Sequence, residues 1–281
     1  MKIFEAYKET VDRLRDRSDK REAESTARIL FEDLAGSRHP VSDSRLLGEA
    51  EELQLKRGLQ RLLGGEPINY VTGIKEFYGL RFKVNPNVLI PRPETEELVE
   101  WVTETLSGKS GLHILDIGTG SGCIPITIDQ LTHGRHKIAG CDVSTEALAL
   151  ARSNNDHLNT KVDFFHCDIL DIQDKPNGKY DVIISNPPYI LHSEDAIMDD
   201  VVVKNEPEIA LFVTGKDPMQ FYKAINQFAK GHLKKNGWLF YEISTLHKDL
   251  LETLMDNDNF DHIEFKKDMS GNWRMCKARI I

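Results

Sequence analysis

The stretch HILDIGTGSG, residues 113–122, joins a short apolar run to an acidic residue at position 116 and three glycines at alternate positions. The apolar run has the composition of a buried parallel strand, and a helix is expected to begin after the glycines. Glycines between a strand and a helix let a ligand approach the main chain closely. This stretch therefore predicts the first strand of an open α/β sheet, with a nucleotide-type site at its carboxyl end.

The spacing of these glycines argues against a dinucleotide site, because the fingerprint Gly-x-Gly-x-x-Gly needs glycine at position 123, where the chain has Cys123. Gly-x-Gly-x-Gly preceded by Asp116 instead resembles the cofactor loop of S-adenosylmethionine-dependent methyltransferases. That resemblance implies that Asp116 orders the loop and the amino group of the methionine moiety. The loop residues expected to hold the cofactor are Gly118, Thr119, Gly120, Ser121 and Gly122.

From residue 112 onward, strand-like and helix-like segments alternate, which is typical of a doubly wound sheet. A helix is expected from about 218 to 233, among others. We predict an α/β fold with seven strands, near residues 112–117, 137–142, 161–166, 180–185, 236–243, 262–267 and 273–280.

Polar residues end three of the later strands, at Asp142, Asp168 and Asn186. Parallel strands present their carboxyl ends at one edge of a sheet, so these side chains are expected to lie together with Asp116. A carboxylate at Asp142 can accept both hydroxyl protons of a ribose. Asp168 is well placed to accept the amino hydrogens of an adenine, with Ile169 against the ring.

The run IISNPPY, residues 183–189, stops a buried strand at an amide, two prolines and an aromatic ring. The prolines remove two backbone donors and leave carbonyl groups without helix or sheet partners. Asn186 Oδ1 and the Pro187 carbonyl can accept the two hydrogens of an amino or amide nitrogen. Tyr189, which follows Pro188, offers a flat face for a planar group. The alternative is a simple turn after a strand, since Pro-Pro turns are common.

The amino-terminal part reads as helical. Ile3, Tyr7, Val11 and Leu14 have helical spacing, and a second such series runs from Ala23 to Leu34. One or two further helices are expected before Gly64. Their apolar positions would be Leu46, Leu47, Leu53, Leu55, Leu59, Leu62 and Leu63. We predict a helical substrate-recognition domain over 1–70, a hairpin connector over 71–92 and a methyltransferase domain over 93–281.

Prolines flank Arg92 just before an amphipathic helix that runs from Leu98 to Leu106. Thr95 or Glu94 is expected to cap this helix. Arg92, held in a stiff extended segment, is either a surface residue or a fixed cation that lines the site.

The 281 residues are 40% hydrophobic and 29% charged, which indicates a soluble globular protein. No apolar run approaches the roughly 20 residues of a membrane span, and the amino terminus lacks the apolar core of a signal peptide, so the cytoplasm is the expected compartment. Four separated cysteines (123, 141, 167 and 276) are expected to be buried and reduced. The net charge of −9 argues against binding that depends on phosphate neutralisation.

Four motifs together resemble the protein-(glutamine-N5) methyltransferases that modify bacterial peptide-chain release factors: residues 90–96, 116–122, 186–190 and 205–207. The resemblance covers nearly the whole chain and implies S-adenosylmethionine as cofactor and the glutamine of a Gly-Gly-Gln loop as target. It also points to Arg92, Glu94, Glu206 and Pro207 as residues that shape the site. One departure is Pro125, where the family usually has a small residue; a proline in the first turn of a helix is tolerated.

Three alternatives stay open at this point. A sister family methylates a ribosomal protein, although it carries Pro-Arg-Ser-Pro where this chain reads PRPE at 91–94. An amino methyltransferase acting on adenine or guanine would use the same Asn-Pro-Pro-Tyr chemistry on a flipped base. A cofactor-binding protein without catalysis is the third. The acidic charge disfavours the nucleic-acid target, and the intact 186–189 motif disfavours the last.

Overall fold

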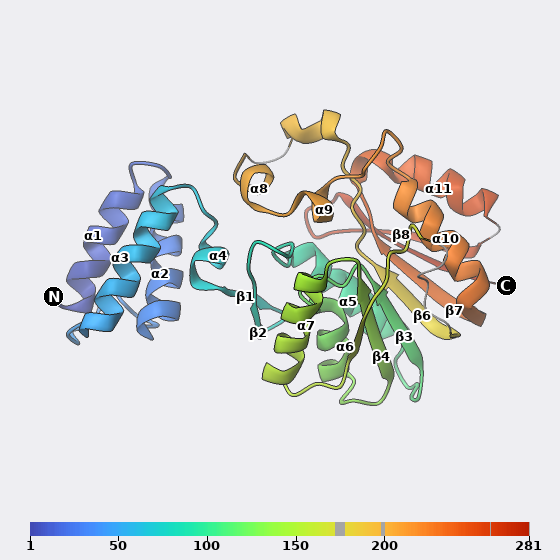
Figure 1. The fold of residues 1–281 in the computed structure, drawn as a ribbon, viewed down its shortest axis with the longest axis horizontal. Coiled ribbons are helices and arrows are strands. Elements are labelled where there is room, and N and C mark those ends of the chain that lie inside the picture. Colours follow the sequence, from blue (N-terminus) through green and yellow to red (C-terminus); the bar gives the residue numbers. More distant parts are fainter. Residues whose placement is uncertain (172–177, 198–199, 259, 281) are drawn as a thin grey trace. The chain divides into compact units, whose positions relative to one another are not determined.

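The computed structural model describes residues 1–171, 178–197, 200–258 and 260–280 (Figure 1). The chain forms two compact units. The helical unit contains residues 1–74 together with 200–205, and the sheet unit contains the remaining described residues. Each unit has its own hydrophobic core.

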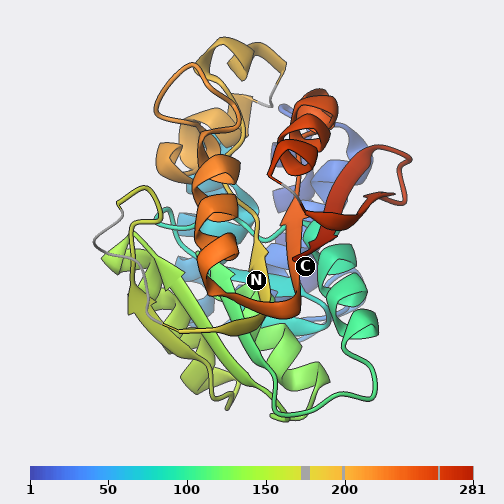
Figure 2. The same ribbon diagram turned by 90° about the vertical axis from the view of Figure 1, so that its right-hand side faces the viewer.

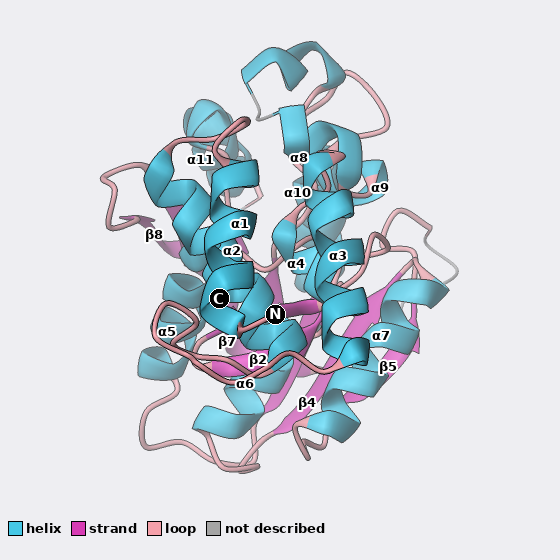
Figure 3. Ribbon diagram, turned by 90° about the vertical axis from the view of Figure 1, so that its left-hand side faces the viewer, coloured by secondary structure: helices cyan, strands magenta, loops and turns pink. Residues whose placement is uncertain are grey.

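The helical unit packs its helices around Ile3, Leu30 and Phe31, which are fully buried. Figure 3 draws these helices, like all others, in cyan. Asp19 caps the second helix by accepting hydrogen bonds from two backbone N–H groups. Asn205 joins the last segment to the rest of this unit by donating to the Gly65 carbonyl at 3.2 Å. The helices are α1 (Ile3–Leu14), α2 (Lys20–Ala35), α3 (Glu49–Leu63), α4 (Ile68–Thr72) and α8 (Asp200–Asn205).

Two of the leucines expected in this helical core are exposed. Leu46 lies before α3, in a segment bridged to Lys2, because the helix begins only at Glu49. Leu53 lies on the outer face of α3, whereas Leu55 and Leu59 face the core. The prediction was wrong for Leu46 because helical periodicity was extended beyond the actual start of the helix, and for Leu53 because this position of α3 faces solvent.

The predicted hairpin consists of β1 (Ile74–Phe77) and β2 (Leu80–Lys83). Phe77 and Phe82 are fully buried and meet edge to face, with ring centroids 5.9 Å apart. Both rings belong to the core of the sheet unit.

The large sheet has the seven strands that were predicted, and their order in the sheet is β5-β4-β3-β6-β7-β9-β8. Strands β5, β4, β3, β6 and β7 run parallel, whereas β9 is antiparallel to both of its neighbours. Figure 1 shows the parallel strands side by side. Their bounds are β3 (His113–Ile117), β4 (Lys137–Asp142), β5 (Asp163–His166), β6 (Tyr180–Ser185), β7 (Leu233–Glu242), β8 (Asp261–Lys267) and β9 (Trp273–Arg279).

Helices cover both faces of this sheet (Figures 1 and 2). Successive strand residues point to opposite faces, so Ile114 packs with α5 (Pro93–Thr105), α6 (Cys123–Leu131) and α7 (Thr145–His157). Leu115 packs on the other face with α10 (Gln220–His232) and α11 (Lys248–Asn257). The short elements are η2 (His192–Ile197), α9 (Glu208–Leu211) and η3 (Thr245–His247).

Neither Thr95 nor Glu94 caps α5. Arg92 occupies the N-cap position without a side-chain cap, and Pro93 is the first helical residue. The Thr95 hydroxyl donates instead to Glu242 at 2.6 Å, and both side chains are buried. The expected cap is wrong because Pro93 moves the start of the helix forward and turns Thr95 into the protein interior.

All four cysteines are buried and unpaired, as expected. None of the helices among the described residues combines the length and apolar character that crossing a lipid bilayer requires.

Candidate active site

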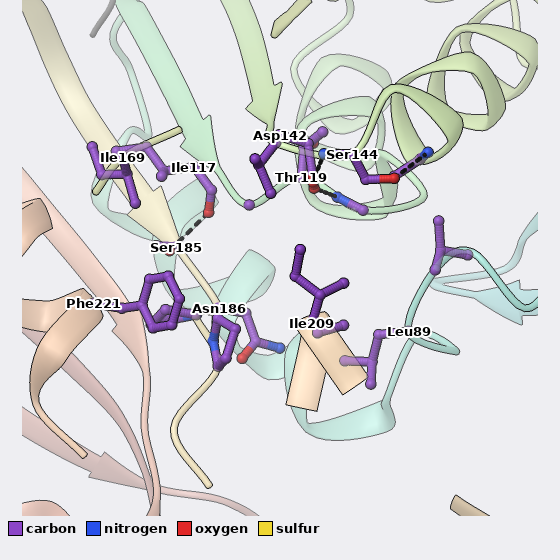
Figure 4. Close-up of a pocket in the computed structure, with 18 of the residues that line it drawn as sticks. Leu89, Ile117, Thr119, Asp142, Ser144, Ile169, Ser185, Asn186, Ile209 and Phe221 are labelled. Carbon is purple, nitrogen blue, oxygen red and sulfur yellow. Dashed lines mark hydrogen bonds between the residues drawn. The ribbon is translucent and has the colours of Figure 1, made fainter. Parts of the chain in front are cut away.

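A cavity of 240 Å³ lies in the sheet unit at the carboxyl ends of β3, β4 and β6 (Figure 4). The strand register explains why these ends meet, since Ile117 pairs with both Cys141 and Ser185. Most of the predicted site residues lie on the cavity wall: Arg92, Gly118, Thr119, Gly120, Ser121, Asp142, Asp168, Ile169, Asn186, Pro187 and Pro188.

The glycine loop needs glycine for two different reasons. Gly120 has φ of 53°, a left-handed conformation that leaves its backbone open to the cavity. Gly122 has φ of 79° but is not part of the wall, and a Cβ there would lie 3.0 Å from the Phe164 ring. Of the two, Gly120 borders the ligand space, whereas Gly122 permits the close packing of α6 on the sheet.

Asp142 holds this loop in place. Its Oδ2 accepts a hydrogen bond from the Gly120 N–H at 2.8 Å, and its Oδ1 accepts one from Ser144 at 2.9 Å. Burial raises the pKa of the carboxyl, although these N–H donors oppose the shift. Each carboxylate oxygen keeps a further lone pair, so Asp142 can still accept two hydroxyl protons from a ligand.

Asp116 lies at the end of β3 and is fully buried, with neither oxygen hydrogen-bonded. The Thr119 and Ser121 hydroxyl groups are buried without partners as well. Burial raises the pKa of Asp116 to about 7; Thr119 lies near enough to oppose this shift, but its hydroxyl does not reach hydrogen-bond geometry. Thr119 and Ser121 line the cavity, whereas Asp116 does not. Unsatisfied polar side chains on and next to the glycine loop indicate a site for a polar ligand.

Asp168 and Ile169 line the cavity just after β5. Asp168 Oδ1 accepts from the Leu170 N–H at 2.8 Å, while Ile169 is buried against the wall. Phe221, from α10, lines the same cavity. Figure 4 shows Ile169 and Phe221 on the same side of the cavity as Ser185.

The turn after β6 directs Asn186 into the cavity (Figure 4). The preceding Ser185 anchors the strand end, because its hydroxyl donates to the Ile117 carbonyl at 2.7 Å. Among the described residues, the Asn186 side chain and the Pro187 carbonyl have no hydrogen-bond partner. Two acceptors are thus available to a ligand on the cavity wall.

Tyr189 does not lie on the cavity wall. Its ring packs with the core on the α10 side of the sheet, and its hydroxyl interacts with Arg274. Arg274 in turn forms an ion pair with the buried Asp268 at 3.2 Å. Burial raises the pKa of the Tyr189 phenol. The Tyr189 ring thus anchors the turn in this structure. The flat face predicted for it is turned into the core and not toward the cavity.

Glu206 connects two wall segments without lining the cavity itself. Its side chain is 1% exposed and forms an ion pair of 2.6 Å with Arg92, which does line the cavity. Its other oxygen accepts the Ile90 N–H at 3.1 Å. Glu94 lies outside the wall too, and Pro207 occupies the N-cap position of α9.

Several wall residues carry no signal of a site in the sequence. They are mostly apolar, and no local pattern separates a side chain on a cavity wall from one in the core. They include Leu89, Thr95, Ile209, Phe221 and Ile225.

Glu206→Gln is expected to lower the free energy of unfolding of the sheet unit by about 1–3 kcal/mol. The amide can still accept from Ile90, but it leaves the Arg92 charge without its partner. Urea denaturation measures the difference.

The exposed pair of Asp217 and Lys223, at 2.6 Å, offers a matched control. Asp217→Asn should change stability by less than about 0.5 kcal/mol. An equal loss of unfolding free energy in Glu206→Gln and Asp217→Asn would show that burial of Glu206 does not strengthen the effect of its ion pair on stability.

The fold and the site define the class of protein. Residues 95–208 match the family model described as "Methyltransferase small domain". A methyltransferase from Pyrococcus furiosus has the same fold, with a TM-score of 0.54 and 19% identity, covering 78% of this chain and 95% of that one. The protein is a methyltransferase.

Relatives identify the family within that class. The chain is 40% identical over 242 residues to a release factor glutamine methyltransferase of Flavobacterium psychrophilum, covering 85% of this chain and 84% of the relative. It is 37% identical over 233 residues to the Bacteroides thetaiotaomicron protein of that name, covering 83% of each. The chain belongs to the release factor glutamine methyltransferase family.

Proposed function

We propose that this protein transfers a methyl group from S-adenosylmethionine to the side-chain amide nitrogen of the glutamine in the Gly-Gly-Gln loop of a peptide-chain release factor. The observation that carries the proposal is the pair of unpartnered acceptors on the cavity wall, Asn186 Oδ1 and the Pro187 carbonyl. They match the two hydrogens of a primary amide. Family membership supports glutamine as the source of that amide.

The residues at the glycine loop suit S-adenosylmethionine. Thr119 and Ser121, on the cavity wall, and Asp116, at the end of β3, are buried without partners, and an amino-acid end with its ammonium and carboxylate groups would satisfy them. Asp142 would accept the ribose hydroxyl protons, and Asp168 the adenine amino hydrogens beside Ile169. The bound cofactor supplies an electrophilic methyl group on a sulfonium.

The acceptor amide needs orientation, because its nitrogen lone pair is delocalised into its own carbonyl. Asn186 and Pro187 would accept both N–H hydrogens, which turns the nitrogen toward the cofactor end of the cavity. Their oxygens would also stabilise the positive charge that grows on nitrogen as the N–C bond forms and the S–C bond breaks. The cofactor would leave as the thioether S-adenosylhomocysteine, and the methylated nitrogen would lose one of its two protons to water. Tyr189 would act as a positioning residue, since the packing of its ring against the core would hold the turn.

Label transfer from methyl-labelled S-adenosylmethionine tests the proposal against three acceptors: a release factor, the same factor with its Gly-Gly-Gln glutamine replaced, and genomic DNA. We expect label only in the unaltered release factor. Label in DNA but not in the factor would overturn the proposal in favour of a base methyltransferase, and label in none, with cofactor still bound, would indicate a binding protein.

The affinity for S-adenosylmethionine is expected to rise about tenfold as the pH increases from 5.5 to 7.5. Burial raises the pKa of Asp116 to about 7, so the carboxyl is mostly neutral at the lower pH and ionised at the higher one. Only the ionised form attracts the cofactor ammonium. Calorimetry measures the dissociation constant at each pH.

Asp116→Asn removes the titrating group and should bind more weakly with a flat pH profile over this range. An unchanged slope in that variant would assign the pH dependence to another group.

A further inference from the structure

We propose that Leu89 and Ile209 form an apolar collar at the cavity mouth that selects a side-chain amide over a nucleobase amino group; this inference rests on the proposed function. Both side chains line the cavity, yet Ile209 is 55% exposed, which places it at the opening. Figure 4 shows Ile209 between Asn186 and Leu89. A glutamine side chain that enters between them would contact both on its way to Asn186 Oδ1 and the Pro187 carbonyl.

The collar is held rigidly from both sides. Glu206, three residues before Ile209, binds the Ile90 N–H next to Leu89 and the Arg92 guanidinium. The segment after Ile209 is tied to the Asn186 turn, because Ile190 donates to the Leu211 carbonyl at 3.2 Å and accepts from Val213 at 2.9 Å. The spacing between Leu89, Ile209 and Asn186 is thus set before an acceptor arrives, which favours selection by shape.

The chemistry of the collar matches a glutamine side chain. Its two methylene groups would lie against the methyl surfaces of Leu89 and Ile209 while the amide reaches Asn186. A base is a rigid plane that proteins commonly hold by stacking it on aromatic side chains. Phe221 is the one aromatic residue among the described residues of the wall, and it comes from α10 rather than from the collar. Tyr189 packs into the core.

Ile209→Ala and Leu89→Ala test the collar. Each is expected to raise the KM for the release factor about fivefold, because part of the apolar contact with the glutamine stem is lost. The dissociation constant for S-adenosylmethionine should stay within twofold. Leu250→Ala is the matched control, since Leu250 is 53% exposed on α11 and does not line the cavity. It should leave the KM unchanged.

The wild-type enzyme is assayed in parallel on the release factor and on a single-stranded DNA oligonucleotide, so that the two proposals can fail separately. If the wild type methylates the factor but both collar variants match Leu250→Ala, the collar is overturned and the proposed function stands. If the wild type methylates the oligonucleotide at a comparable rate, the collar does not select, whatever the variants show. If the wild type leaves the factor unmodified, the proposed function fails together with the collar.

Discussion

Asn186→Ala should lower kcat for methylation of the release factor by about 10²–10³. On the proposed mechanism the side-chain oxygen is one of two acceptors that orient the amide nitrogen and stabilise its growing positive charge, and alanine cannot replace it. Asn186 is half-buried at a turn, so its truncation should not disturb the core of the sheet unit. Initial rates with labelled S-adenosylmethionine measure the loss.

Two measurements make this result specific to the chemical step. Calorimetry should give an unchanged dissociation constant for S-adenosylmethionine in Asn186→Ala. Asn257→Ala removes an exposed amide at the end of α11 and should retain wild-type kcat. Near wild-type turnover in Asn186→Ala, with folding and cofactor affinity intact, would falsify the proposed mechanism.

Asp142→Ala should weaken binding of S-adenosylmethionine about 10²-fold. The carboxylate would accept two ribose protons, and a hydrogen bond to a charged group contributes about 1.5–3 kcal/mol. Because about 1.4 kcal/mol corresponds to a tenfold change in affinity, the loss of two such bonds weakens binding about 10²-fold or more. Truncation also removes the acceptors for Gly120 and Ser144, which order the glycine loop. Both effects act in the same direction in a calorimetric titration.

The control for this variant is Asp163→Ala, which removes an exposed carboxylate at the start of β5. It should bind the cofactor as the wild type does. Undiminished affinity in Asp142→Ala would remove the ribose role of this residue and leave it as a structural support of the loop.

Periodicity and strand-end chemistry were sufficient to predict the sheet. The predicted strand of residues 137–142 agrees with β4 in both bounds, and that of 180–185 with β6. Buried parallel strands are recognisable in the sequence because both faces must be apolar, while the polar residue that ends each strand interrupts this pattern. Asp142 and Asn186 could be assigned to one edge for that reason alone.

Local sequence was a poorer guide where a side chain has two possible neighbours. Thr95 has the chemistry of a helix cap, but the chain brings Glu242 beside it from 147 residues away. Tyr189 follows the acceptor motif directly, yet its ring packs into the core with α10. The direction of a side chain at a turn depends on backbone angles and on distant partners, which residue order does not specify.

The sequence by itself determined three features of this protein. They are the glycine loop, the successive strands that end in polar residues, and the two hydrogen-bond acceptors expected at Asn186 and Pro187. Only the tertiary structure decided which residues surround them. The contact between Arg92 and Glu206 spans 114 positions, and the segments that it joins place Leu89 and Ile209 on the wall of one cavity. Apolar side chains carry no chemical signature of a site, because burial in a core and exposure at a cavity mouth use the same residue types.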